Sequence, residues 1–315
     1  MPYIINAVRF YYMQQQNLYQ ALNQGLILER YTCIKRNIEK NKVLIAKWGG
    51  LQKVVSLLSG KHVIVCGAGK SLDEATKVLR KYQHRNDLVI IAADMAYKPL
   101  VVNGINPHFT ISCEAMPVPY YAFLPTSSCH LLAFSGVNSN TPGTWKGKIS
   151  FYNWMLYDEP FNLLWKMAGE HLGYVATASI VTTQAISLSL GCSIASLSIV
   201  GNDLAFKHSY YAGNTVVGER FLMEYNRCNT ANTQDYAMIQ KKKMYIVKRR
   251  ESIYYTDHQF LAARQWLEDL FSQITVPVYD CSVPGCAENK VIKIAINKVM
   301  NKLYPEKKPK KKRQS

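Results

Sequence analysis

The chain has 315 residues and an ordinary globular composition, with 48% hydrophobic and 19% charged residues. Its formal net charge is +17, part of it in the basic run 307–313. No apolar run has the length of a membrane span, and residues 1–10 lack the apolar core of a signal peptide. The eight cysteines show no metal-type clustering, so we expect reduced thiols in a cytoplasmic protein.

Residues 1–58 are expected to be helical. Leu18, Leu22 and Leu26 recur at a spacing of four and form one apolar stripe, and residues 30–58 continue the helical pattern up to Gly49-Gly50. This segment is predicted to pack against a sheet or a partner protomer, and it shows no residues of evident chemical function.

Residues 61–115 predict a β-α-β-α-β unit. Three apolar runs, at 63–66, 88–93 and 109–113, are separated by helix-like segments and end at a glycine turn, at Asp94 and at Glu114. Such a pattern indicates a parallel sheet, whose ligands lie outside the carboxyl ends of the strands. The three strand endings are therefore expected to converge on one crevice.

The turn after the first strand reads Gly67-Ala68-Gly69-Lys70-Ser71. The turn does not match a P-loop, because Ile64 stands where that motif needs its first glycine, and it does not complete a dinucleotide fingerprint, because Leu72 replaces the third glycine. A tight glycine turn before a helix still favours phosphate. Ser71 is expected to cap this helix, with Glu74 as its capping-box partner.

The rest of the chain continues the α/β pattern. Short strands are expected at 130–134 and 149–152, a helix at 178–190, and a buried strand at 194–200 that ends in Gly201-Asn202-Asp203. Residues 204–258 form a long excursion of the kind that builds lids or acceptor-binding loops. A helix at 258–273, a strand at 276–280 and a helix at 291–303 precede the basic tail.

Four blocks in matching order resemble the motility accessory factor (Maf) flagellin glycosyltransferases: 67–73, 92–109, 201–206 and 278–287. The resemblance covers roughly residues 45–295. The same family is similar to bacterial sialyltransferases, which use CMP-activated nonulosonic acids, and to archaeal 6-hydroxymethylpterin diphosphokinases. This chain departs from the pattern at Lys70, Glu114 and Asn202, where the family has proline, aspartate and glutamine.

The resemblance implies an α/β fold with a Rossmann-like parallel sheet and flanking helices, a GT-A-like or sialyltransferase-like variant, plus the N-terminal helical segment. The expected divisions are a helical segment at 1–58, a nucleotide-binding Maf-type domain at 59–295, and a helix end with a basic disordered tail at 296–315. The tail is expected to contact an anionic surface, and no motif indicates a role in nucleic-acid binding.

Combining motif and resemblance gives a set of expected site residues. His208 is the candidate general base, because it follows the Asp203 block on a flexible segment and its side chain titrates near neutral pH. Asp203 is expected to bind the donor or a metal, and Asp94, Glu114 and Asp203 together would suit Mg²⁺. The expected nucleotide-binding residues are Gly67, Ala68, Gly69, Lys70, Ser71, Leu72, Asp94, Glu114, Ser179, Gly201 and Asn202.

Three functions remain open from the sequence. The first is a glycosyltransferase-like enzyme that uses a nucleotide-activated sugar, with a CMP-nonulosonic acid as candidate donor and flagellin or another protein or glycan as acceptor. The second is a Mg²⁺-dependent 6-hydroxymethylpterin diphosphokinase that uses ATP. The third is a noncatalytic nucleotide-binding module.

Overall fold

The computed structural model describes residues 18–207, 209–217, 244–249, 252–285 and 291–305 of the chain. Its centre is a nine-stranded sheet in which every neighbouring pair of strands is parallel. The strand order is β11-β10-β7-β1-β2-β3-β4-β5-β6. The expected Rossmann-like parallel sheet is thus confirmed.

The strands of this sheet are short and mostly buried. They are β1 (His62–Cys66), β2 (Leu88–Ala93), β3 (Phe109–Ser112), β4 (His130–Phe134), β5 (Ile149–Trp154), β6 (Tyr174–Val175), β7 (Ser196–Val200), β10 (Val278–Asp280) and β11 (Ile292–Lys293). The six residues of β2 are all buried, as expected for a strand with helices on both faces.

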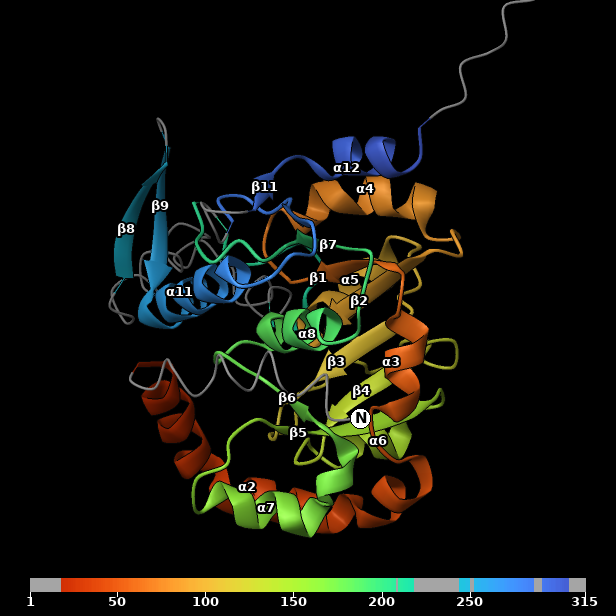
Figure 1. Cartoon of the computed structure of the whole chain (residues 1–315), viewed down its shortest axis with the longest axis vertical. Coiled ribbons are helices and arrows are strands. Elements are labelled where there is room, and N and C mark those ends of the chain that lie inside the picture. The colour runs from red at the N-terminus through yellow and green to blue at the C-terminus, as the bar shows by residue number, and fades with distance from the viewer. Residues whose placement is uncertain (1–17, 208, 218–243, 250–251, 286–290, 306–315) are drawn as a thin grey trace, which may run out of the picture.

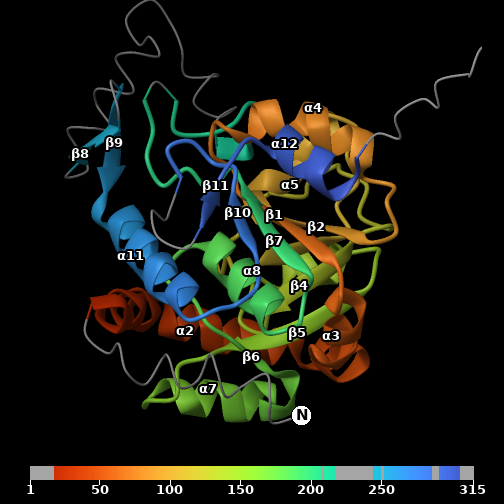
Figure 2. The ribbon, with the colours of Figure 1, turned by 45° about the horizontal axis from the view of Figure 1, so that its top comes forward.

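Helices connect these strands and cover the sheet (Figure 1). They are α2 (Leu18–Trp48), α3 (Gln52–Leu58), α4 (Leu72–Tyr82), α5 (Asp94–Val102), α6 (Asn140–Thr144), α7 (Phe161–Ala168), the 3₁₀ turn η1 (Glu170–Leu172), α8 (Val181–Leu190), α11 (His258–Ser272) and α12 (Ile296–Leu303). Figures 1 and 2 show α4 beside α12 at one end of the molecule and α2 beside α7 at the other.

The long helix α2 buries one side against the sheet layer. Ile34, Ile38 and Ile45 are at most 5% exposed and follow helical spacing, so α2 has a buried apolar face. The apolar stripe predicted at Leu18, Leu22 and Leu26 lies outside the side chains that the structure describes. The helix contacts α7, α11 and β5. The N-terminal helical prediction is therefore confirmed for the described residues, and the helix packs on the same core as the sheet.

The C-terminal part differs from the sequence prediction at one point. The helix expected at 291–303 begins only at Ile296, because Ile292 pairs with Tyr279 and extends the edge of the sheet as β11. The excursion after β7 contains an antiparallel hairpin, β8 (Met244–Arg249) and β9 (Ser252–Asp257). A bridge between Phe206 and Tyr255 ties this hairpin to the chain that leaves β7.

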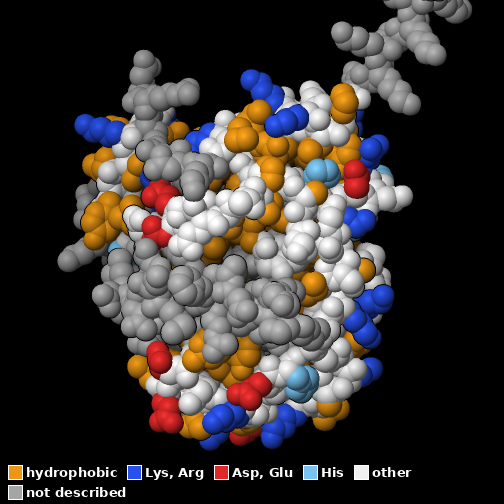
Figure 3. Space-filling model, in the orientation of Figure 1, with side chains coloured by type: hydrophobic (Ala, Val, Ile, Leu, Met, Phe, Trp, Pro, Cys, Tyr) orange, Lys and Arg blue, Asp and Glu red, His pale blue; other side chains and the backbone are white. Residues whose placement is uncertain are grey.

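On the face shown in Figure 3, Lys and Arg side chains lie around the rim, with Asp and Glu side chains among them. Across the described segments, no helix is both long and apolar enough to cross a bilayer. The basic run 307–313 lies outside the described residues.

Candidate functional site

The described residues enclose a cavity of about 430 Å³ at the carboxyl ends of β1, β2, β3 and β7. Strands β1 and β7 are neighbours at the point where the order of the sheet reverses, which is where open α/β sheets bind their ligands. The predicted residues that line this cavity are Ala68, Gly69, Asp94, Glu114, Ser179, Gly201, Asn202 and Asp203. The strand endings therefore converge as the sequence predicts.

The turns that follow β1 and β7 pack directly on each other. The Gly67 N–H donates to the Val200 carbonyl at 2.8 Å, and the Gly69 N–H donates to the Gly201 carbonyl at 2.7 Å. A side chain on Gly67 would overlap the Gly201 carbonyl, and Gly201 itself has φ +65°. Close backbone contact thus explains these glycines, and the N–H of Gly69 is already paired within the protein.

Asp203 joins three segments at the rim of the cavity. Its carboxylate accepts hydrogen bonds from the Ser71 hydroxyl, from the Ser71 N–H at 2.9 Å and from the Val283 N–H at 3.2 Å. Burial raises the pKa of Asp203 to about 6, and the negative charge of Asp280 adds to this. These contacts make Asp203 a link between the β1 turn, β7 and the loop after β10.

The capping role expected for Ser71 is not what the structure shows. Ser71 has φ −65° and ψ −13° and makes no side-chain cap bond to α4, so the predicted capping box with Glu74 is wrong. Its hydroxyl instead donates to the Asp203 carboxylate, and its oxygen accepts from the Gly201 N–H at 3.2 Å.

Four predicted residues of the turn, Gly67, Lys70, Ser71 and Leu72, are not among the residues that line the cavity. Lys70 is on the surface, where its ammonium pairs with the Asp73 carboxylate at 2.7 Å. Leu72 is fully buried in the core. Neither residue lines the cavity, so nucleotide contacts by Lys70 and Leu72 stay predictions without geometric support.

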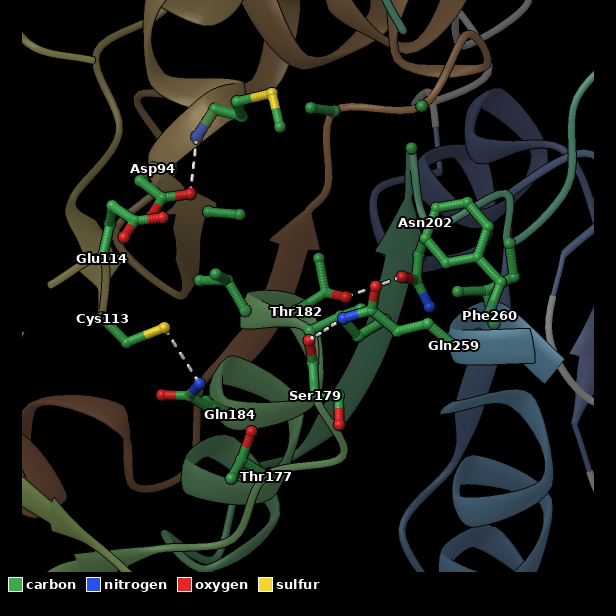
Figure 4. Close-up of a pocket in the computed structure, with 18 of the residues that line it drawn as sticks. Asp94, Cys113, Glu114, Thr177, Ser179, Thr182, Gln184, Asn202, Gln259 and Phe260 are labelled. Atoms are coloured by element: carbon green, nitrogen blue, oxygen red, sulfur yellow. Dashed lines mark hydrogen bonds between the residues drawn. The ribbon is translucent and has the colours of Figure 1, made fainter. Parts of the chain in front are cut away.

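Asp94 and Glu114 form the acidic side of the cavity (Figure 4). Asp94 is 4% exposed and accepts hydrogen bonds from the Met95 N–H at 2.8 Å and the Ser112 hydroxyl at 3.3 Å. Burial raises its pKa to about 7, and the charge of Glu114 contributes in the same direction. Glu114 is paired with the Arg30 guanidinium at 2.9 Å.

Asn202 stands at the opposite side, beside the first turn of α8. Its side-chain oxygen accepts from the Thr182 hydroxyl at 2.7 Å, and its backbone N–H donates to the Ser282 hydroxyl at 3.0 Å. Its amide nitrogen is buried and has no hydrogen-bond partner among the described residues. A buried donor without a partner is costly, so this nitrogen is a natural contact for a ligand acceptor atom.

Ser179 precedes α8 and is held in an uncommon conformation. Its φ is +65°, and its carbonyl accepts from the Gln259 side chain at 2.8 Å (Figure 4). Through this bond the start of α11 is fixed against the start of α8. A non-glycine residue in this region of φ/ψ space is typical of sites where the backbone is positioned for function.

Several residues of the cavity were missed by sequence reasoning. Arg30 comes from the N-terminal segment, to which no chemistry was assigned, and Gln259 and Phe260 come from the start of α11. Arg30 is 84 residues from its partner Glu114, so no local pattern indicates the contact. Tyr210 and Tyr211 do lie in the segment after Asp203 that was expected to cover a site.

Two predictions, the general base and the metal site, remain untested. His208, the expected general base, lies outside the described residues. Within the described part of the chain, no three His, Cys, Asp or Glu side chains are grouped so as to hold a metal ion. Asp94 and Glu114 are neighbours, whereas the Asp203 carboxylate is turned to Ser71 and Val283.

A family model described as 6-hydroxymethylpterin diphosphokinase MptE-like matches residues 35–209, which is more than half of the chain. A solved structure of the MAf glycosyltransferase from Magnetospirillum magneticum AMB-1 is similar at 17% identity and a TM-score of 0.49. The match covers 76% of this chain and 33% of that one, so this chain spans about a third of that protein's length. No curated protein matches.

The family model spans the glycine turn, the Asp94 and Glu114 strand endings, the start of α8 and the Asn202-Asp203 turn, which together supply most of the cavity. The chain belongs to the 6-hydroxymethylpterin diphosphokinase MptE-like family.

Proposed function

We propose that the protein is a transferase that binds a nucleotide-activated sugar, with a CMP-linked nonulosonic acid as candidate donor, and moves the sugar to a hydroxyl of a protein or glycan. The observation that carries the proposal is the buried, unpartnered amide nitrogen of Asn202 beside the first turn of α8. A helix N-terminus favours an anion, and the amide supplies a directed donor to one of its oxygens. This pair of features suits a single phosphate group.

The charge of the cavity supports a donor with few phosphates. Arg30 is the one lysine or arginine among the described residues that line it, and it is already paired with Glu114. Asp94 and Asp203 add two further acidic groups. A triphosphate would carry three or four negative charges into this cavity, whereas a CMP-linked nonulosonic acid carries about two, one on the phosphodiester and one on the sugar carboxylate.

The residues then take complementary roles in the reaction. Asp94 and Glu114 accept hydrogen bonds from ribose hydroxyls or base amino groups, and Asn202 with the start of α8 holds the phosphate. An acceptor hydroxyl attacks the anomeric carbon, the bond from that carbon to the phosphate oxygen breaks, and the nucleoside monophosphate leaves. The donors around the phosphate balance its growing charge, and a base such as His208 takes the acceptor proton.

A second candidate is a pterin diphosphokinase, favoured by the description of the family model. In that case Asp94 and Glu114, which lie together, would hold Mg²⁺ and the metal would neutralise the phosphates of ATP. The two candidates differ in nucleotide and in metal requirement, so one binding experiment separates them.

The test is calorimetric titration of the full chain with CMP, UDP, GDP and ATP, each with and without Mg²⁺. We expect CMP to bind without a metal requirement. Asn202→Ala removes the amide donor and should weaken CMP binding about tenfold or more, since a hydrogen bond to a charged group contributes about 1.5–3 kcal/mol. Asn103→Ala, an amide on the exposed end of α5, is the matched control.

The outcomes are distinct. Metal-dependent binding of ATP in place of CMP would favour the diphosphokinase. If none of the four nucleotides binds, both transferase candidates are refuted, and a noncatalytic module with another ligand remains. Where CMP binds, release of CMP from CMP-linked nonulosonic acid with an added acceptor tests the transfer step itself.

A further inference from the structure

A second cavity, of about 600 Å³, lies at the other end of the strands, where their amino ends meet. It is formed around the amino ends of β1 to β5 by residues that begin these strands or immediately precede them. Because β2 is six residues long, this cavity is roughly 15–20 Å from the nucleotide cavity along the strand. The two cavities share no lining residue among those described.

The lining of this second cavity is basic. The lysine, arginine and histidine side chains around it are Lys61, His84, Arg85, His108, His130 and Lys148. None of the described residues that line it is acidic. Like charges gathered in one concave site repel each other, and an anion bound among them would relieve that repulsion.

The charged groups of Lys61, Arg85 and Lys148 differ in how many contacts they make with other residues of the protein. The Lys61 ammonium donates to the Asn86 carbonyl at 2.9 Å. The Arg85 guanidinium lies 3.8 Å from the Asp87 carboxylate and 4.2 Å from the centre of the Tyr304 ring. Lys148 is exposed at the cavity, and no carboxylate among the described residues pairs with it. Lys148 is therefore the cation most available to a ligand.

Two of the histidines that line this cavity, His108 and His130, are partly buried. His108 Nδ1 accepts from the Ile90 N–H at 3.1 Å, so the ring proton of the neutral form is on Nε2. Burial lowers the pKa of His108 and lowers that of His130 to about 4. His130 stacks on Phe109 with ring centroids 5.2 Å apart. His108 and His130 are thus neutral at neutral pH, and Lys61, Arg85 and Lys148 supply positive charge.

We propose that this cavity binds a phosphate-bearing small molecule at a site separate from the nucleotide cavity. The guanidinium of Arg85 and the ammonium of Lys148 are the donors that recognise phosphate, and the hydroxyls of Ser127 and Ser128 lie on the same lining. The volume is in the range of pockets that hold ligands of nucleotide size. A concave site favours a small molecule over an extended polyanion.

The test is calorimetric titration of the full chain with inorganic pyrophosphate. Lys148→Gln removes the available cation from the cavity, and Lys146→Gln removes the same charge two residues earlier, outside the cavity. We expect pyrophosphate to bind the parent and Lys146→Gln alike, and Lys148→Gln to bind about tenfold more weakly. Asn202→Ala, in the other cavity, should leave the affinity unchanged.

Three results would overturn the proposal. The first is that pyrophosphate does not bind the parent chain, and the second is that the two lysine variants bind it with equal affinity. The third is that Asn202→Ala loses binding while Lys148→Gln retains it, because pyrophosphate would then bind in the nucleotide cavity. Citrate tests the ligand class, since it has similar charge without phosphorus. Binding of citrate as tight as that of pyrophosphate would also count against a phosphate site.

Discussion

Replacing Asp94 by asparagine removes a buried charge while keeping its contacts. The asparagine oxygen can accept from the Met95 N–H, and the new amide can donate to the Ser112 hydroxyl. Burial raises the pKa of Asp94 from 3.8 to about 7. The native protein therefore holds a proton in this range that the unfolded chain releases, and parent stability falls as the pH rises through about 4 to 7.

The size of the effect follows from the pKa difference. One unit corresponds to about 1.4 kcal/mol, so the carboxylate costs the folded state about 4 kcal/mol above pH ~7 and about 1.5 kcal/mol at pH ~5. Asp94→Asn lacks this cost. We expect the variant to be more stable than the parent by these amounts, with the larger difference at high pH.

Urea denaturation followed by circular dichroism, at about pH 5 and about pH 8, measures both differences. Asp203 is present in both proteins, so its own titration cancels in the comparison. Glu74→Gln, on the exposed side of α4, controls for loss of one surface charge. A stability difference between Asp94→Asn and its parent that is the same at both pH values would show that Asp94 is not buried as an uncompensated carboxylate.

Three further predictions concern other parts of the molecule. Gly201→Ala places a side chain at φ +65° against a backbone carbonyl and should destabilise by about 2–4 kcal/mol in urea, whereas Gly143→Ala, with open space around it, should be close to neutral. Tyr304→Phe loses the hydrogen bond to Asp87 at 3.1 Å and should lower stability by about 0.5–1.5 kcal/mol, measured by thermal melting. Arg30→Gln should change stability by less than about 1 kcal/mol, since its ion pair is partly exposed, yet weaken CMP binding several-fold in calorimetry.

The sequence predicts the central sheet well because its strands are continuous apolar runs. The strands at 62–66, 88–93 and 109–112 and their parallel order follow from those runs and the helices between them. The two-residue strands β6 and β11 carry no such signal, since their pairing depends on neighbours placed by the rest of the fold. For the same reason the start of α12 was predicted several residues too early.

The candidate site is predictable only where it is built from strand endings. Asp94, Glu114 and Asn202 follow apolar strands, so their convergence could be inferred before the fold was known. The direction of each side chain could not. Ser71 looks like a helix cap in sequence and becomes a partner of Asp203 only once β7 lies next to β1.

The cavity is assembled from shared and flanking parts of the chain. The family model matches residues 35–209. Of the residues that line the cavity, Arg30 lies before this range, and Gln259 and Phe260 lie after it. The part of the chain that matches the family model thus supplies most of the cavity, and residues outside that part supply the rest. Substitutions at these flanking residues would change the shape and charge of the cavity without any change to the part of the chain that matches the family model.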